Sequence, residues 1–124
     1  MQIKISNEAG RIVIDHEVVA RVAGYAAMDC YGVVGMAAKN IRDGLVHLLR
    51  RESLTKGIMI KRGLDAQGGD VLALDLHIIV EYGTNISAIA QVLIDTVKYR
   101  VQEYVGIEVA DINIFVDGIR NNNS

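Results

Sequence analysis

The sequence predicts a single α+β domain over residues 1–124, a two-layer sandwich. A mixed sheet of about four strands carries two principal helices on one face, together with one short helix. The first observation behind this is the alternation over residues 71–83, where each even-numbered side chain is large and apolar, as in a strand with one buried face. The second is the long amphipathic segment that follows, residues 84–105. The third is the length, because 124 residues, 51% of them hydrophobic, suffice for one compact core but not for two.

The first half of the chain is predicted to contain a strand, a helix, a second strand and the short helix. Residues 11–14 form the strand, and Asp15 can cap a helix that runs to about residue 29 or 30. The residues of its apolar stripe, spaced i, i+3, i+4, are Val18, Val19, Val22, Ala23, Ala26 and Ala27. Residues 33–38 form the second strand, and residues 40–52 the short helix.

The second half supplies the centre of the sheet. A strand over residues 57–62 turns back antiparallel, through the loop 63–70, into the central strand 71–83. The long helix then carries an apolar stripe of Ile86, Ile89, Ala90, Leu93, Val97, Val101 and Tyr104, and Gly106 ends it. The last strand, residues 107–116, points Ile112, Ile114 and Val116 inward. Because a strand, a helix and a strand in this order form a crossover, the last strand should run parallel to the central one. A polar tail begins at about residue 120.

Both helices are expected on one face of the sheet, which leaves the other face uncovered. We call this surface the outer face and predict it as the interaction surface; its residues are Met59, Lys61, Asp75, His77, Ile79, Asn113 and Phe115. It is half apolar, which suits a partner better than water. His77 lies on the same strand face as Asp75 and Glu81, so a role in acid–base catalysis is one interpretation. A polar network between strands is the favoured interpretation.

The charge is unevenly distributed along the chain. The net charge is −2, but residues 39–62 hold seven basic and two acidic side chains, a net +5 that leaves −7 for the rest. The predicted basic patch within this window consists of Arg42, Arg50, Arg51, Lys56 and Arg62. A bipolar molecule can be steered toward a complementary surface, including that of a second copy. A solvated basic face without a partner is the other interpretation.

Several functional classes are disfavoured. No apolar run approaches the roughly 18–20 residues of a membrane span, and residues 1–10 lack the apolar core of a signal peptide. A single Cys30 cannot form an internal disulfide, which agrees with a reducing cytoplasm. The sequence therefore predicts a cytoplasmic protein that does not itself cross a membrane.

No cofactor, metal or catalytic site is predicted. The residues that could bind zinc, His16, Cys30, His47 and His77, show no short ligand pair, and Cys30 is expected to be a buried, inert thiol. No phosphate-loop, dinucleotide or nucleophile-elbow pattern occurs. Residues 32–35 match the GxxG pattern of KH domains, but they lack a basic residue and lead into a strand, and the chain is acidic. Binding to nucleic acid is therefore disfavoured.

Four spaced motifs carry a family resemblance. They cover residues 10–20, residues 31–37, residues 75–83 with Asn85 and Ile86, and residues 106–116. Together they resemble the alkaline shock protein family of Gram-positive bacteria, which are general-stress and cell-envelope-stress proteins. The chain is most similar to the short, tail-less members found across the Firmicutes, and it lacks the long charged extensions of the larger ones.

The resemblance implies a cytoplasmic, non-enzymatic protein that self-associates, with no catalytic residues. It also implies that a separate, membrane-anchored partner could hold the protein at the inner face of the membrane, as for some members. The first functional prediction is therefore an interaction or scaffold protein of the cell-envelope stress response. The alternatives are an accessory or regulatory subunit of a metabolic enzyme and a KH-like RNA-binding module. Replacing Ile79 and Phe115 with aspartate is expected to weaken association.

Overall fold

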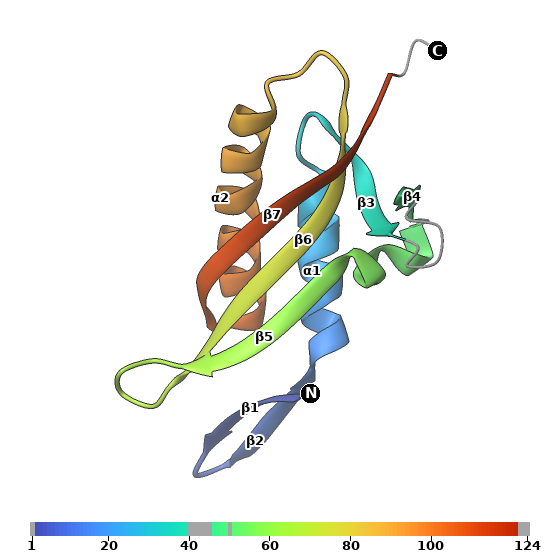
Figure 1. The fold of residues 1–124 in the computed structure, drawn as a ribbon. Coiled ribbons are helices and arrows are strands. Elements are labelled where there is room, and N and C mark those ends of the chain that lie inside the picture. The colour runs from blue at the N-terminus through green and yellow to red at the C-terminus, as the bar shows by residue number, and fades with distance from the viewer. Residues whose placement is uncertain (1, 40–45, 50, 122–124) are drawn as a thin grey trace.

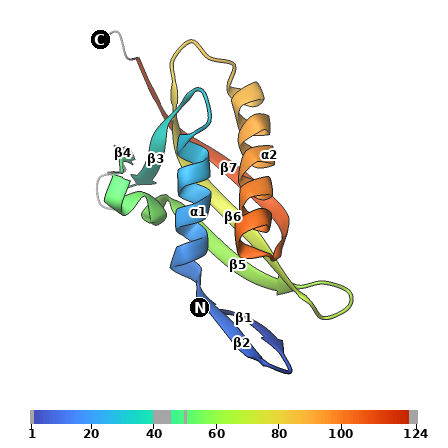
Figure 2. The same cartoon turned by 180° about the vertical axis from the view of Figure 1, so that it is seen from behind.

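The sheet and the two helices form two layers, as the computed structural model shows (Figure 1). The structure describes residues 2–39, 46–49 and 51–121, with the side chains of residue 39 and residues 51–53 left out. Five strands form one mixed sheet, and two further strands form a separate hairpin. Seen from behind, both helices lie in front of the sheet (Figure 2). The predicted α+β class is confirmed, with five strands rather than about four in the main sheet.

Strand β6 (Asp70–Glu81) is the centre of the sheet. Strand β7 (Glu108–Arg120) runs parallel to it along one edge. Two strands share the other edge end to end: β5 (Ile58–Leu64) pairs antiparallel with residues 70–76, and β3 (Val33–Lys39) pairs antiparallel with residues 78–80. The short strand β4 (Val46–Leu48) extends the sheet beyond β3. The predicted parallel and antiparallel neighbours of the central strand are confirmed.

The inward side chains of β6 form the middle of the core. Leu72, Leu74, Leu76, Ile78 and Val80 are all 0% exposed, as the alternation predicts. Tyr82, in contrast, is 66% exposed because the strand ends at Glu81 and the chain turns at Gly83, where φ is +92°. The prediction that Tyr82 points into the core is therefore wrong.

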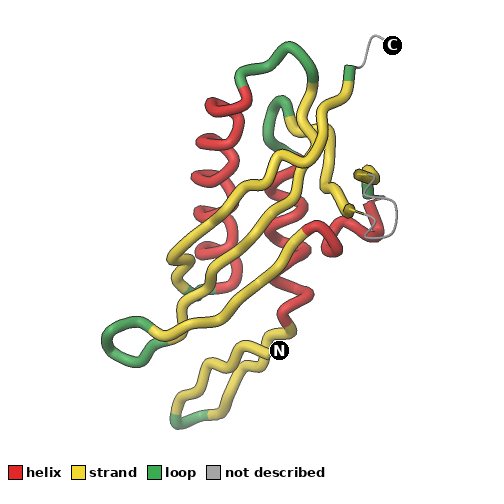
Figure 3. Tube along the Cα trace, in the orientation of Figure 1, coloured by secondary structure: helices red, strands yellow, loops and turns green. Residues whose placement is uncertain are grey.

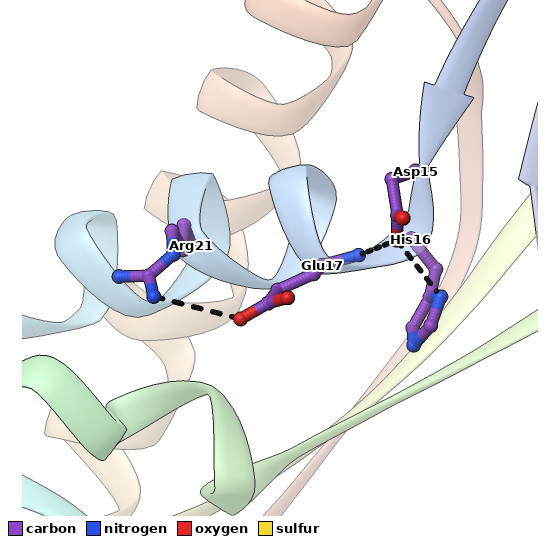
Figure 4. A network of polar contacts seen from close by, with 4 residues as sticks. All are labelled: Asp15, His16, Glu17 and Arg21. Atoms are coloured by element: carbon purple, nitrogen blue, oxygen red, sulfur yellow. Dashed lines mark hydrogen bonds and ion pairs between the residues drawn. The ribbon is translucent and has the colours of Figure 1, made fainter.

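Helix α1 (His16–Met28) begins at the predicted cap. The Oδ1 atom of Asp15 accepts a hydrogen bond from the backbone N–H of Glu17 at 3.0 Å, and His16 Nδ1 lies 3.2 Å from the same oxygen (Figure 4). Arg21 Nη2 lies 3.5 Å from Glu17 Oε1. Asp15 and Glu17 place two acidic groups at the N-terminus of α1, which is the positive end of the helix dipole.

The buried face of α1 is rotated from the predicted one. Val18 is 51% exposed, which contradicts its place in the predicted stripe, whereas Ala20 and Gly24 are buried. The cause is the 3₁₀ helix η1 (Arg51–Gly57), whose Leu54 packs against Gly24 so closely that a Cβ there would lie 2.2 Å from Leu54 Cδ1. One flank of α1 is thus covered by η1 as well as by the sheet.

Helix α2 (Ile86–Val105) follows the prediction closely. Asn85 caps its N-terminus through a 3.1 Å hydrogen bond from the N–H of Ala88, and Gly106 ends it in the left-handed region, with φ +79°. Its buried stripe is Ile89, Leu93, Val97, Val101 and Val105. The predicted end members of the stripe are wrong, since Ile86 is 39% and Tyr104 71% exposed near the helix ends.

The N-terminal hairpin is the element that the sequence analysis missed. Strand β1 (Gln2–Asn7) pairs antiparallel with β2 (Gly10–Asp15), which contains the predicted strand (Figure 3). The register places Ile3 opposite Ile14, and Ile3 is fully buried in the main core. The hairpin is therefore attached to the domain through its isoleucine face.

Two more boundaries differ from the prediction. Of the helix expected over residues 40–52, Val46–Leu48 is a strand and Arg51 begins the 3₁₀ helix, while residues 40–45 and 50 lie outside the described residues. The last strand continues to Arg120, and Val116, which was predicted to point inward, is 38% exposed.

Candidate functional site

The face of the sheet that both helices leave open is the candidate site, turned toward the viewer in Figure 1. The register places Met59, Asp75 and Asn113 side by side across β5, β6 and β7. One step along β6, His77 lies beside Phe115 on β7. In the other direction Lys61 shares a row with Ala73 and Asp111. Six of the seven predicted outer-face residues are thus brought together: Met59, Lys61, Asp75, His77, Asn113 and Phe115.

Ile79 is the exception. It is 2% exposed, although its odd number places it on the outer side of β6. The register between β6 and β7 shifts between Ile78 and Ile79. A Cβ at Gly118 would lie 3.4 Å from Ile79 Cγ1 and 3.6 Å from Val46 Cγ1, which shows how closely β4 and β7 surround it. Ile79 is a packed residue, and its assignment to the exposed surface was wrong.

Asp75 is the centre of a polar network between strands. Asn113 Nδ2 donates a hydrogen bond to Asp75 Oδ1 at 2.9 Å, and Lys61 Nζ lies 3.3 Å from Asp75 Oδ2. The Asn113 hydrogen bond and then Lys61 lower the pKa of Asp75 from its ordinary value of 3.8, while partial burial opposes them. The carboxylate is therefore held ionised and fixed in position across three strands.

Replacing Asn113 with alanine is expected to raise the pKa of Asp75 toward 3.8, since the largest cause of its lowering is removed. In the wild type the folded chain binds this proton more weakly than the unfolded chain, so the stabilisation is present above 3.8 and is lost as pH falls through the lowered pKa. The variant should therefore lose less stability than the wild type over the same decrease in pH. NMR titration of the Asp75 carboxyl carbon measures the change. Gln91→Ala, on the exposed side of α2, is the control and should leave that titration unaltered.

His77 is held by a residue that the sequence analysis did not select. Its Nδ1 atom lies 2.7 Å from Asp117 Oδ2, and its ring stacks on Phe115 with centroids 4.7 Å apart and planes 14° from parallel. Asp117 is the extra residue of β7 at the register shift, between the partners of Ile78 and Ile79. Because alternate side chains of a strand share a face, the outward positions of Asn113 and Phe115 could have predicted that Asp117 also lies on the outer face. The favoured interpretation of a polar network between strands is confirmed.

The predicted basic patch does not assemble among the described residues. Arg42 and Arg50 lie outside the described part of the chain, and of Arg51 only the backbone, in η1, is described. Lys56 is exposed in the last turn of η1. Arg62 of β5 instead contacts two other strands. Its Nε atom lies 3.6 Å from Asp70 Oδ1 in β6, and its Nη1 atom donates a 3.1 Å hydrogen bond to the carbonyl oxygen of Gln2 in β1.

The other candidate chemistry is structural where it is described. Cys30 is buried, with Sγ 3.5 Å from the carbonyl oxygen of Ala26, as expected for an inert thiol. Within residues 2–39, 46–49 and 51–121, no three acidic, histidine or cysteine side chains are grouped to hold a metal ion. Gly32 lies in a turn with φ +85° and Gly35 in β3, so the GxxG pattern does not join two helices as in a KH domain. The helices in the described part are too short or too polar to cross a membrane.

A hollow lies at the N-terminus of α2, apart from the outer face. Its volume is about 380 Å³, and it is lined by Tyr31, Gly83, Thr84, Asn85, Ala88, Ile89 and Val92. Gly32 allows the α1–β3 turn to approach α2, because a Cβ there would lie 2.3 Å from Ile89 Cδ1. None of these lining residues is charged, and most are apolar. The polar side chains of Thr84 and Asn85 already form hydrogen bonds with backbone groups.

Comparisons with known proteins bear on the identity of the chain. The chain is 44% identical over 124 residues to uncharacterized protein YloU of Bacillus subtilis (strain 168), covering 99% of both chains. It is 31% identical over 122 residues to uncharacterized protein Spy1614 of Streptococcus pyogenes serotype M6, covering 97% of this chain and 96% of that one.

A third relative is uncharacterized protein YqhY of Bacillus subtilis (strain 168), 24% identical over 111 residues, which cover 90% of this chain and 78% of that one. No solved structure matches. A model of the alkaline shock protein 23 family, described as having a cell envelope-related function, matches residues 4–121. The resemblance carried by the four motifs is thereby confirmed, and the chain belongs to this envelope-related family.

Proposed function

We propose that this protein is a non-enzymatic interaction or scaffold protein of the cell-envelope stress response, and that it binds its partner through the outer face. The observation that carries the proposal is a sheet face that no helix of the described residues covers. This face exposes Met59 and Phe115, 57% and 43%, beside an ordered polar network. Membership of an envelope-related family supports the cellular role.

The outer face has the properties of a preformed contact surface. Phe115 is stacked on His77, which is held by Asp117, and Asn113 and Lys61 are held by Asp75. Side chains already fixed by cross-strand bonds lose little rotamer freedom when a partner binds. An aromatic ring and a methionine surrounded by polar groups also resemble the composition of protein interfaces. These properties make the outer face better suited to contact with a protein than to exposure to water.

The partner is proposed to be a second copy of the chain, a membrane-anchored protein, or both. The family resemblance supports each of them, and it also supports a cytoplasmic location with recruitment to the inner face of the membrane as part of the proposal. The role as an accessory subunit of a metabolic enzyme would use the same face, but no described feature favours it.

Replacing both Met59 and Phe115 with aspartate is expected to weaken self-association, or capture of a membrane-anchored partner, by about 30-fold or more, as for the loss of central interface residues. The fold should persist because both side chains are exposed. Ile79 is unsuitable for this test, since a buried carboxylate there would destabilise the sheet. Multi-angle light scattering over a concentration series and co-purification with membrane proteins measure the two kinds of binding.

The matched control replaces Val92 and Tyr99 with aspartate, on the helix side of the domain, where they are 57% and 67% exposed. This control should bind as the wild type does, and circular dichroism should show both double variants folded. A wild-type protein that remains a monomer at high concentration and captures no membrane protein would contradict the proposal.

A further inference from the structure

We propose that the free edge of β7 binds an extended, basic segment of a different protein, which adds to the sheet as a further strand. In this segment apolar side chains alternate with lysine or arginine. The inference rests on the proposed function, because the added strand borders the outer face, and it specifies the chemistry of the partner. It follows from the backbone, the apolar residues and the charges of β7.

Strand β7 forms one edge of the main sheet (Figure 1). In the part of the chain that the structure describes, it pairs with β6 and with no other strand. Residues 111–116 pair with residues 73–78 in unbroken register, between two shifts at which Ala110 and Asp117 are the extra residues. Because a bulge interrupts regular pairing, the stretch open to a new strand is residues 111–116, about 20 Å long.

Residues 111–116 lack most of the features that protect an edge strand from pairing. They contain no proline, glycine or lysine, and Asp111 is the one charged residue among them. The others are Asn113 and four β-branched or aromatic residues, which favour strand pairing. A regular edge of this composition is a template for another strand. The bulges at its two ends confine the pairing to this stretch.

The side chains that point toward the helices determine one half of the pattern in the added segment. Ile112 and Ile114 are partly buried against the core, and Val116, in the same row by alternation, is 38% exposed. Every second side chain of an added strand would lie beside this row. Apolar side chains at these positions would extend the core and cover the exposed part of the row.

The side chains on the other side of β7 determine the second half of the pattern. Glu108 and Asp111 are exposed, and neither forms an ion pair with another described residue. Lysine or arginine in the added strand would lie opposite these carboxylates, and opposite charges across neighbouring strands attract.

The charge of the whole outer face agrees with a basic partner. Register and side-chain contact place five carboxylates and two basic groups on it, a net −3; they are Asp75, Glu81, Glu108, Asp111 and Asp117, with Lys61 and Arg120. The chain as a whole has a net charge of −2. Charge complementarity therefore favours a basic segment of a different protein over a second, acidic copy at this edge.

Synthetic peptides test the inference. The probe is a fluorescent peptide of about eight residues that alternates lysine and valine, has blocked ends and can span the open stretch. Fluorescence anisotropy at low salt should show binding, which added salt weakens, and NMR should place the shifted backbone amides in residues 111–116. Two control peptides should bind at least about tenfold more weakly: one alternates glutamate and valine, and the other is the lysine–valine peptide methylated at every backbone nitrogen. The first lacks the opposite charge and the second cannot donate backbone hydrogen bonds.

Charge reversal on β7 gives the second part of the test. The variant Glu108→Lys with Asp111→Lys should bind the lysine–valine peptide at least about tenfold more weakly than the wild type, and the glutamate–valine peptide more tightly. Its control, Glu8→Lys with Asp95→Lys, carries the same charge change at exposed positions in the β1–β2 turn and on α2. The control should bind both peptides as the wild type does. Equal losses in the two variants would show that net charge alone governs binding, and would overturn the inference.

Three other outcomes would also overturn it. Shifted amides that lie outside residues 111–116 would place the peptide elsewhere. Equal binding of the methylated peptide would show that no strand is added. Amides of residues 111–116 whose protection from hydrogen exchange rises with protein concentration would assign the edge to a second copy. In each case the proposed function would stand if partner binding still depended on Met59 and Phe115.

Discussion

Leu74→Ala is expected to lower the free energy of unfolding by about 2–5 kcal/mol, the cost of a buried leucine lost from a core. Leu74 is 0% exposed and stands in the middle of β6, opposite Ile60 of β5 and Ile112 of β7. Because strands hold β6 on both edges, the surroundings cannot easily collapse into the vacated space. Urea denaturation followed by circular dichroism measures the difference.

Leu64→Ala is the matched control, a leucine at the end of β5 that is 67% exposed. Its removal should change the free energy of unfolding by no more than about 0.5 kcal/mol, the usual range for surface positions. Equal losses in the two variants would contradict a core centred on β6.

Gly57→Ala is expected to lower the free energy of unfolding by about 1–3 kcal/mol, the range for overpacking. A Cβ at this position would lie 2.9 Å from the carbonyl oxygen of Ala37, 3.1 Å from Met36 Cβ and 3.3 Å from the carbonyl oxygen of His77. Two of these neighbours are backbone atoms, so they can move only if β3 or β6 moves. The opposing gain from a stiffer unfolded chain, about 0.4–1 kcal/mol, is smaller.

The control for this substitution is Gly63→Ala in β5, the strand that begins directly after Gly57. There the new Cβ would meet only Val71 Cγ2, at 3.6 Å, which is ordinary contact. This variant should be neutral or slightly stabilised, and chemical denaturation of the two side by side gives the comparison. A Gly57→Ala protein as stable as the Gly63→Ala protein would show that the strands around Gly57 yield without cost.

The sequence was informative where a regular period extended over many residues. The alternation of β6 and the stripe of α2, with Asn85 before it and Gly106 after it, gave nearly the observed elements, because both patterns are local. The outer face followed from them, since its strands pair in register. Asp75 and His77 were recognised as neighbours of other polar groups for the same reason.

The missed features depend on contacts between distant segments. Ile79 was wrongly predicted to be exposed. The alternation within β6 does not reveal the register shift against β7 or the approach of β4, because both depend on tertiary contacts. Strand β4 has only three residues, and the leucine spacing around it resembles that of a helix. The β1–β2 hairpin had a detectable signal in the alternating isoleucines from Ile3 to Ile14, which pair across its strands.

The position of Gly57 also bears on how the sheet can open. It stands where β3 and β5 meet along one edge of β6, so that this edge consists of two separate ladders. The β3 ladder has three register pairs with β6 and the β5 ladder has seven. Local unfolding follows the boundaries of such cooperative units. The end of the sheet that holds β3 and β4 can thus detach at the cost of few hydrogen bonds, while β5, β6 and β7 keep the outer face intact.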